Sequence, residues 1–365
     1  MNILICVIEW EHWVSDMRKK LKTDNYNLPL TRSVMFDNAV KGDAEIGIEI
    51  EVEGRNLPRT GLKGWVIHED GSLRGESAEY VFRNPVNREQ YPYILKNLQD
   101  SLASANAVVN ESYRTSVHVH VNARDMFVKD IYTQILLYAL FDDALAPFYG
   151  HDRKGNLFCL RARDAGYLMD TLRRAVLEDR ITYLNTNEIR YTQLNPVSLF
   201  RHGSLEYRAM RGTVDMDKIA EWVQILLAMK DSAIGLNNPT HMINTLNGIG
   251  VDEFARNIFG AHVDRFEKGW QDSVMSVVDQ VEHIAHACAW LSKEELAKKP
   301  EKKPELYTKR AVDPGLRPPP EGFRQAPDFR NIAVEAARIN QFILRNNEVV
   351  RADDFWNEHG ADEEL

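Results

Sequence analysis

This chain of 365 residues has few cysteines, no excess of positive charge and no long apolar run. Its three cysteines, Cys6, Cys159 and Cys288, lie far apart, so they predict neither a disulfide framework nor a zinc cluster. The net charge of −9 argues against a general nucleic-acid binder, whose affinity comes from neutralising phosphates. The apolar start meets Glu9 and Glu11 without a basic leader, so we expect neither a secretory signal nor a membrane span. A soluble protein of the reducing cytoplasm is the expectation.

Strand and helix patterns occupy different parts of the chain. Residues 45–82 and 115–122 alternate apolar and polar side chains, which is the strand signal. Apolar residues at helical spacing predict helices within 130–150, 217–236, 252–259, 264–297 and 331–346. Because strands and helices do not alternate as in parallel βαβ units, we predict an α+β fold. Its sheet should be curved and largely antiparallel, with helices behind it and a helical C-terminal region.

Four segments follow from the composition. Residues 1–44 are predicted to be an N-terminal extension, and residues 45–297 a domain that holds the chemistry-bearing side chains and a helical scaffold. Residues 298–330 are rich in proline and lysine and predict an extended connector. Residues 331–365 read as a helix with an acidic tail.

A carboxylate strand opens the second segment. In "EIGIEIEVEG", Glu45, Glu49, Glu51 and Glu53 share one face of a strand, because side chains alternate between faces. Neighbours on that face lie roughly 7 Å apart and repel by about 0.6 kcal/mol in water. The face is either a solvated acidic surface or a platform for Mg²⁺ or Mn²⁺, which prefer carboxylate oxygens.

A hairpin signal follows this strand. "WVIH" precedes Asp70-Gly71, a favoured turn pair, and a second alternating run contains Glu79. Glu79 is a candidate to present a further carboxylate opposite the first strand. Asp70 and Ser72 either bind the amino end of a substrate or only make the turn.

Two imidazoles and an amide share a face in "HVHVNA", where His118, His120 and Asn122 alternate with valines. Two histidines at this spacing suit a metal or a phosphate, and packing in the core is the plainer alternative. Zinc is competing chemistry, since strand histidines separated by one residue also occur in zinc hydrolases. The surplus of glutamates favours an oxygen-rich site for several cations.

"GSLEYRAMRGT" places Glu206 and Arg208 on one strand face. Arg211 has the opposite parity and joins that face only if a bulge or turn intervenes. The pair is either a plain salt bridge or a metal ligand beside a phosphate clamp, because the guanidinium fork matches phosphoryl oxygens. Arg190 in "IRYTQLNP" is a weaker cationic candidate.

As an ordered set, these motifs resemble the amidoligase family, which is similar to glutamine synthetase and γ-glutamylcysteine synthetase. The segments that carry the resemblance lie between about residues 45 and 225 and are "GIEIEVEG", "HEDGSL", "AEYVF", "SVHVHVNA", "RYTQLNP" and "GSLEYRAMRGT". The resemblance implies a glutamine synthetase-like sheet and ATP-dependent amide formation with Mg²⁺ or Mn²⁺. In that chemistry a carboxylate takes a phosphoryl group from ATP, and an amine then displaces phosphate from the acyl phosphate.

The resemblance also implies roles for particular residues. The metal ligands it implies are Glu49, Glu51, Glu79, His118 and Glu206. The ATP contacts we expect are His120, Asn122, Arg208 and Arg211. The catalytic residues we expect are Arg208, Arg211 and Glu79. Glu45 and Glu53 flank the paired carboxylates without an assigned role.

Two other hypotheses stay open beside the ligase. One is a metal-dependent zinc hydrolase that uses the His-x-His strand, and the other is a binding or assembly protein on the same fold without catalysis. For the ligase, the expected partners are small-molecule or peptide carboxylates and amines, with no membrane and no strong nucleic-acid signal; a homo-oligomer is left open. Since such ligases are often encoded by phages, the host cytoplasm is the expected location for a viral copy.

Overall fold

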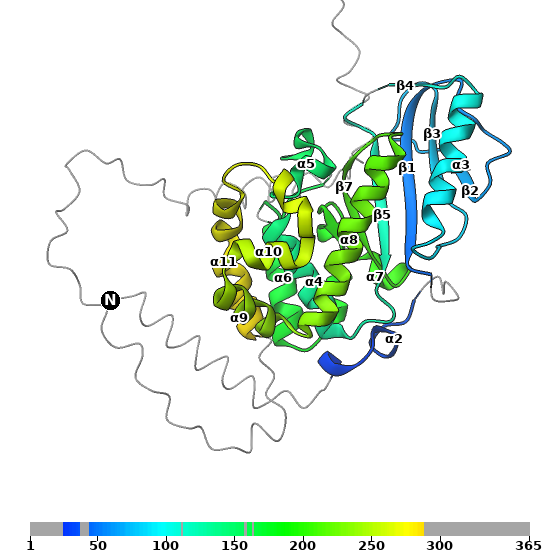
Figure 1. Ribbon diagram of the computed structural model, residues 1–365. Helices are drawn as coiled ribbons and strands as arrows, with labels where there is room; N and C mark the ends of the chain where they lie inside the picture. The colour runs from blue at the N-terminus through cyan, green and yellow to red at the C-terminus, as the bar shows by residue number, and fades with distance from the viewer. Residues whose placement is uncertain (1–24, 37–43, 111, 157–158, 163, 288–365) are drawn as a thin grey trace, which may run out of the picture. The chain divides into compact units, whose positions relative to one another are not determined.

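The computed structural model describes residues 25–36, 44–110, 112–156, 159–162 and 164–287 (Figure 1). These residues form a mixed α/β fold in which helices back an antiparallel sheet, as the sequence patterns predict. The predicted connector and C-terminal segment, and most of the N-terminal extension, lie outside the described residues.

The sheet has seven strands in the order β2-β3-β1-β5-β7-β6, and β4 pairs with the carboxyl end of β1. Every pairing between these strands is antiparallel, and the sheet does not close on itself. The strands are β1 (Ile46–Arg55), β2 (Trp65–His68), β3 (Ser77–Phe82), β4 (Val108–Asn110), β5 (Ser116–Asn122), β6 (Leu194–Asn195) and β7 (Ser204–Arg211).

Helices gather on the apolar side of the sheet, where α8 packs on β5, α3 and α4 (Figure 1). A second group of helices, α6, α9, α10 and α11, extends this layer away from the sheet. The α-helices are α2 (Leu30–Ser33), α3 (Tyr91–Ser104), α4 (Val128–Phe141), α5 (Ala146–Tyr149), α6 (Gly166–Leu177), α7 (Ser198–Arg201), α8 (Met216–Leu236), α9 (Pro239–Ile249), α10 (Val251–Phe259) and α11 (Trp270–Ala287). The 3₁₀ turns are η1 (Asn25–Asn27), η2 (His151–Arg153), η3 (Ile181–Leu184), η4 (Asn187–Ile189) and η5 (Gly260–Arg265). None of the helices in the described ranges is long and apolar enough to cross a membrane.

Two predicted helices have different bounds in the structure. The single helix expected over 130–150 is split into α4 and α5, and Pro147 lies in the first turn of α5, where its missing N–H costs nothing. The helix expected over 264–297 begins only at Trp270, because Gly269 has a φ of 82° that no helix continues through. The sequence patterns miss α3, α6 and α9; α3 and α9 both carry a proline near their first residue, which reads as a helix breaker.

The connection between β2 and β3 is longer than the Asp70-Gly71 signal suggests. The two strands pair antiparallel, from Trp65 with Phe82 to His68 with Glu79, so the hairpin exists. Residues 69–76 form the loop between them, and Asp70-Gly71 makes only a local turn within it. This length lets Asp70 reach back over the sheet.

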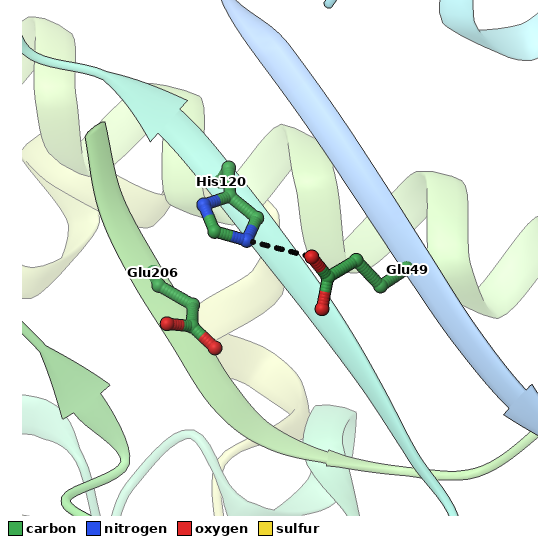
Figure 2. A group of neighbouring side chains, drawn as sticks. All are labelled: Glu49, His120 and Glu206. Carbon is green, nitrogen blue, oxygen red and sulfur yellow. Dashed lines mark ion pairs between the residues drawn. The ribbon is translucent and has the colours of Figure 1, made fainter. Parts of the chain in front are cut away.

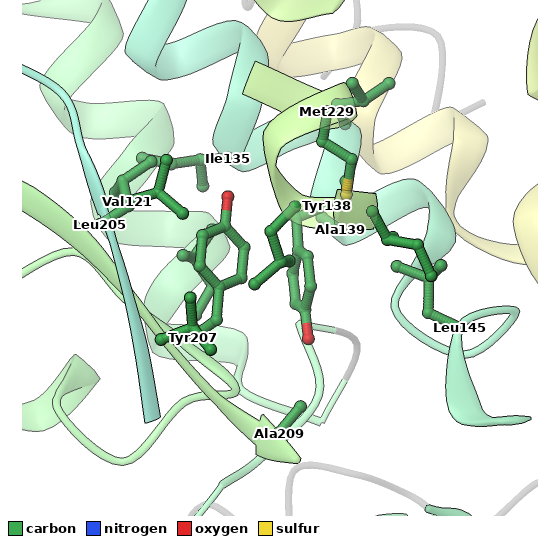
Figure 3. Packing of buried hydrophobic residues seen from close by; sticks show 14 of the residues in the cluster. Val121, Ile135, Tyr138, Ala139, Leu145, Leu205, Tyr207, Ala209 and Met229 are labelled. Carbon is green, nitrogen blue, oxygen red and sulfur yellow. The ribbon is translucent and has the colours of Figure 1, made fainter. Parts of the chain in front are cut away.

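Strand alternation separates an apolar face from a polar one. From β5 and β7, Val121, Leu205 and Tyr207 point into the core, toward Ile135 of α4 (Figure 3). Tyr207 accepts a hydrogen bond of 2.7 Å from Gln134 Nε2, which pairs a buried polar group with its partner. Burying an aliphatic or aromatic side chain in this way stabilises the fold by roughly 1.5–3 kcal/mol.

A bulge in β7 changes the parity of the strand. Val119 pairs with Tyr207 but Val117 pairs with Met210, so β7 has one extra residue at this point. Arg211 consequently pairs with Ser116, which shares the polar face with the histidines. The bulge that the sequence requires for Arg211 to join this face is therefore present.

Close packing just after the bulge depends on Gly212. A Cβ at this position would lie 2.1 Å from Thr115 Oγ1 and 2.5 Å from Thr115 Cβ. The same close approach lets the Gly212 N–H donate to the Thr115 carbonyl at 2.9 Å. The glycine therefore holds the end of β7 against the start of β5.

We expect Gly212→Ala to destabilise the protein by about 1–3 kcal/mol, because the added methyl group must push β7 away from Thr115. Urea unfolding would measure the change. Gly235→Ala is the matched control, since a Cβ there meets no atom within 4 Å and alanine favours the α8 helix. Equal stability of Gly212→Ala and the wild type would contradict the close-packing account.

Candidate active site

The polar face of the sheet is hollowed by a cavity of about 210 Å³, which we call the carboxylate cavity. Strands β1, β3, β5 and β7 supply its floor, while the β2–β3 loop and the segment around α7 supply its rim. The residues that line it are Glu49, Glu51, Asp70, Glu79, His118, His120, Arg190, Asn195, Val197, Ser198, Arg201, His202, Glu206 and Arg208.

Glu49 lies between two imidazoles. His118 Nδ1 is 3.1 Å from Glu49 Oε2, and His120 Nε2 is 3.3 Å from Glu49 Oε1 (Figure 2 shows the second pair). Burial alone would raise the pKa of Glu49, but hydrogen bonds from His118 and His120 outweigh it and hold this pKa well below its usual range. Glu49 is therefore an ionised carboxylate inside the cavity.

Glu206 faces the same imidazoles from β7. It is 7% exposed, accepts a hydrogen bond of 2.6 Å from Asn195 Nδ2, and pairs with Arg208 Nη1 at 2.5 Å. His118 Nδ1 lies 3.6 Å from Glu206 Oε1. Burial works to raise the pKa of Glu206, but the charges of His120, Arg208 and His118 together lower it.

A second carboxylate group lies beside the first. Oxygens of Glu51, Asp70 and Glu79 lie within 4.8 Å of one another. Glu51 is fixed by Ser116, whose N–H and hydroxyl donate to Glu51 Oε2 at 2.8 and 2.7 Å. Burial, followed by the charges of Glu49, Glu51 and Asp70, raises the pKa of Glu79 to about 7.

His120 is held by two hydroxyls on its other nitrogen. Ser204 Oγ and Ser198 Oγ lie 3.1 and 3.2 Å from Nδ1. Nε2 is thereby directed at Glu49, and Glu49, His120 and Glu206 offer ligand atoms within 4.8 Å of one another. Such support of the second ring nitrogen is usual for a histidine that binds a metal ion.

The side chains of the two arginines of β7 lie in different places. Arg208 lines the carboxylate cavity, and its buried Nε has no hydrogen-bond partner among the described residues. Arg211 Nη1 lies 3.7 Å from Asp152 Oδ2, and its stem runs past Gly150. The structure thus places Arg208 in the cavity and Arg211 beside η2, outside the cavity lining.

Most of the sequence-predicted residues meet in this cavity, namely Glu49, Glu51, Glu79, His118, His120, Glu206 and Arg208. Asn122 instead lines a neighbouring cavity of about 200 Å³, which we call the apolar cavity. The donor group formed with Glu49 and Glu206 contains His120, whereas His118 also bonds Ser116 Oγ at 2.8 Å through Nε2. The roles assigned to the two histidines stay predictions.

Sequence reasoning misses the rim of the cavity. The residues without an assigned role are Asn195, Ser198, Arg201 and His202. Most of them come from α7 and the turns beside it, where no strand or helix period marks a face. A weak signal exists for Asn195, which lies within the quoted "RYTQLNP" segment.

The donor chemistry fits divalent cations. The two groups, Glu49 with His120 and Glu206, and Glu51 with Asp70 and Glu79, are rich in carboxylate oxygen, which Mg²⁺ and Mn²⁺ prefer. Burial, and after it the repulsion from neighbouring carboxylates, raises the pKa of Glu79, and a bound cation would relieve that repulsion.

Fold and cavity together define an α+β protein with carboxylates, imidazoles and a guanidinium clustered on its sheet. Residues 84–230 match a family model described as "Putative amidoligase enzyme". The match confirms the predicted resemblance to the amidoligase family and supports a ligase; its segment contains β5, α4 and β7, while β1 and β3 precede it. Among curated proteins, no sequence matches the chain.

We expect Glu79→Gln to stabilise the protein in EDTA near pH 8, and to do so less near pH 5. Because the folded-state pKa is raised from 4.5 to about 7, the folded protein holds a proton that the unfolded chain releases, and stability falls as the pH rises through this interval. Glutamine removes that loss. After allowance for solvent screening, the gain at the higher pH is ~1 kcal/mol, or about 2–4 °C in the midpoint of thermal unfolding.

Glu53→Gln is the matched control, since Glu53 lies on the neighbouring strand β1, outside the cavity lining, and accepts from the Arg74 N–H at 2.7 Å. A Glu79→Gln variant that is less stable than the wild type near pH 8 would contradict the repulsion.

Proposed function

We propose that the protein is an ATP-dependent carboxylate–amine ligase that forms an amide through an acyl phosphate. The observation that carries this proposal is the presence, in one cavity, of two carboxylate groups suited to cations and of Arg208, whose buried Nε–H finds no hydrogen-bond acceptor in the described part of the chain. Cations and a guanidinium are what a transferring phosphoryl group requires. The family match supports the same class of reaction.

Each side chain has a task in this reaction. Glu49, His120 and Glu206 hold one divalent cation, and Glu51, Asp70 and Glu79 hold another. Such cations neutralise charge on the phosphates of ATP. Arg208 donates to the transferring phosphoryl group through Nε, while its Nη1 stays paired with Glu206.

The bonds balance in two steps. A substrate carboxylate oxygen attacks the terminal phosphorus, the bond to the bridging oxygen breaks, and ADP leaves. The amine nitrogen then attacks the acyl carbon, the carbon–oxygen bond breaks, phosphate leaves with the electron pair, and the nitrogen loses a proton. A sheet of glutamine synthetase-like type and a location in the reducing cytoplasm belong to the same proposal.

We expect MgATP to raise the midpoint of thermal unfolding by several degrees in the wild type, but not in Glu49→Gln or Glu206→Gln. A ligand at 100 times its dissociation constant stabilises the native state by about 2.7 kcal/mol. The shift should require Mg²⁺ or Mn²⁺, because the nucleotide is expected to bind through the cation. Each variant should lose the shift, because it removes a carboxylate of the first donor group.

Glu53→Gln is again the control and should keep the shift, because it changes a carboxylate of the same strand outside the cavity lining. A wild-type protein that shows no response to millimolar MgATP and retains stoichiometric zinc would overturn the ligase in favour of the hydrolase. A shift without ADP release on any amine and acid would favour the binding protein.

Arg208→Lys should lower kcat for ADP release by about 10²–10³, because lysine keeps the charge and loses the planar fork that stabilises the transferring group. Steady-state kinetics on Arg208→Lys and Arg211→Lys compare the two arginines of β7. Arg211→Lys should lose much less, since Arg211 faces Asp152 outside the cavity lining. Equal losses would show that Arg211 reaches the phosphoryl group.

A further inference from the structure

The apolar cavity of about 200 Å³ adjoins the carboxylate cavity directly. Glu49, His120 and His202 line both of them, so these three side chains form a shared wall. On its other sides the apolar cavity is lined largely by carbon, including Val81, Phe82 and Pro85. This wall of side chains therefore forms the boundary between the polar reaction centre and the apolar cavity.

Gly47 makes the floor of this cavity. It belongs to β1, pairs with His120, and by alternation shares the face of Glu49. A Cβ added there would lie 3.4 Å from His120 Cβ, an ordinary contact, so the position tolerates a side chain sterically at its first atom. Gly47 and Val81 both line the cavity, so a larger side chain at position 47 would occupy part of its volume.

The position of the cavity restricts its occupant. In a nucleotide, the sugar and the inner phosphates separate the base from the terminal phosphate. A group in the apolar cavity that touches the shared wall is close to the reaction centre. We therefore expect it to be bonded directly to one of the reacting groups. The proposed function offers two such groups, the carboxylate and the amine.

Charge selects between the two. Glu45 and Glu49 line the apolar cavity, and a cationic amine is attracted to them whereas a carboxylate is repelled. Glu45 is paired with Arg88 at 2.9 Å and Glu49 contacts His118 and His120, so it is the position of Glu49 at the shared wall that makes its carboxylate the one an amino group there would meet. Arg124 also lines the cavity, where its backbone N–H and Nε donate to the neutral Asn122 Oδ1 at 3.0 and 3.1 Å. Its positive charge opposes that of an amine, so the selection depends on contact with Glu49 at the shared wall.

We propose that the apolar cavity binds the alkyl group of a primary amine and presents the amino group at Glu49 and His120. The acceptor in amide formation is then an apolar primary amine, rather than ammonia or an acidic amino acid. The acceptor role rests on the proposed function, whereas the binding of the amine does not.

Binding of isoamylamine, its carboxylate counterpart isovalerate, and ethanolamine is measured by saturation-transfer NMR and calorimetry without ATP. We expect the wild type to bind isoamylamine at least tenfold more tightly than either other probe. Gly47→Val fills the cavity with a residue that strands favour, and should weaken isoamylamine tenfold or more. Gly47→Ala is the matched control and should stay within about threefold of the wild type, because its Cβ makes only the ordinary contact with His120.

Thermal unfolding shows whether each variant is folded. Should Gly47→Val fail to fold, Val81→Phe closes the same cavity from β3 and carries the same expectation. Tighter binding of isovalerate than of isoamylamine, or unchanged isoamylamine binding in both filled variants, would overturn the amine site. If the wild type binds isoamylamine but does not respond to MgATP, the ligase proposal is overturned. The acceptor role then falls with it, whereas the amine site stands.

Discussion

One ionised carboxylate, Glu49, held between two imidazoles of the next strand, is the interaction on which the site depends. A carboxylate taken out of water without partners costs several kcal/mol. His118 and His120 offset that cost through contacts of 3.1 and 3.3 Å, and the pKa of Glu49 falls well below its usual range. Glu79, on the opposite neighbouring strand, faces carboxylates instead, and its pKa rises to about 7. The two groups therefore differ in protonation near neutral pH, and cations bound beside them would act on different charges.

Strand register turns this local pairing into a cavity. Glu49 pairs with His118, Glu51 with Glu79, and His120 with Glu206, so the reactive side chains are cross-strand neighbours. A slip of one residue in β1 would carry its carboxylates into the core and its isoleucines into the cavity. The alternation that buries the apolar face under α4 and α8 is thus the same alternation that assembles the polar face, and core stability and site geometry cannot be varied independently.

The sequence predicts those parts of this arrangement that depend on neighbouring residues, and not those that depend on contacts between distant segments. A period of two identifies which residues of β1, β5 and β7 share a face, because alternation is a local property of a strand. Register, loop length and bulges depend on contacts between distant segments. The sequence therefore states the condition for Arg211 but not the bulge that meets it, and places Asp70 in a tight turn rather than in the longer loop of 69–76. Ser198 and His202 escape prediction for the same reason, since the short helix α7 begins at Ser198 and ends just before His202, and its position against the sheet brings both to the cavity.

The wall shared by the two cavities limits how substrates can be arranged. Glu49 and His120 face both the cation groups and the apolar space, so a molecule in the apolar cavity meets the reaction centre at these two side chains. An amine bound there, as we propose, would be fixed relative to the carboxylate groups by the β1–β5 pairing itself, and such placement would convert an encounter of two molecules into a step within one complex. In the proposed reaction, Gly47 and Glu49, two residues apart on one face of β1, would have different tasks: the glycine would leave room for the alkyl group, and the carboxylate would attract the nitrogen. If both proposals hold, a single strand would select the acceptor and hold a cation for the reaction with its partner.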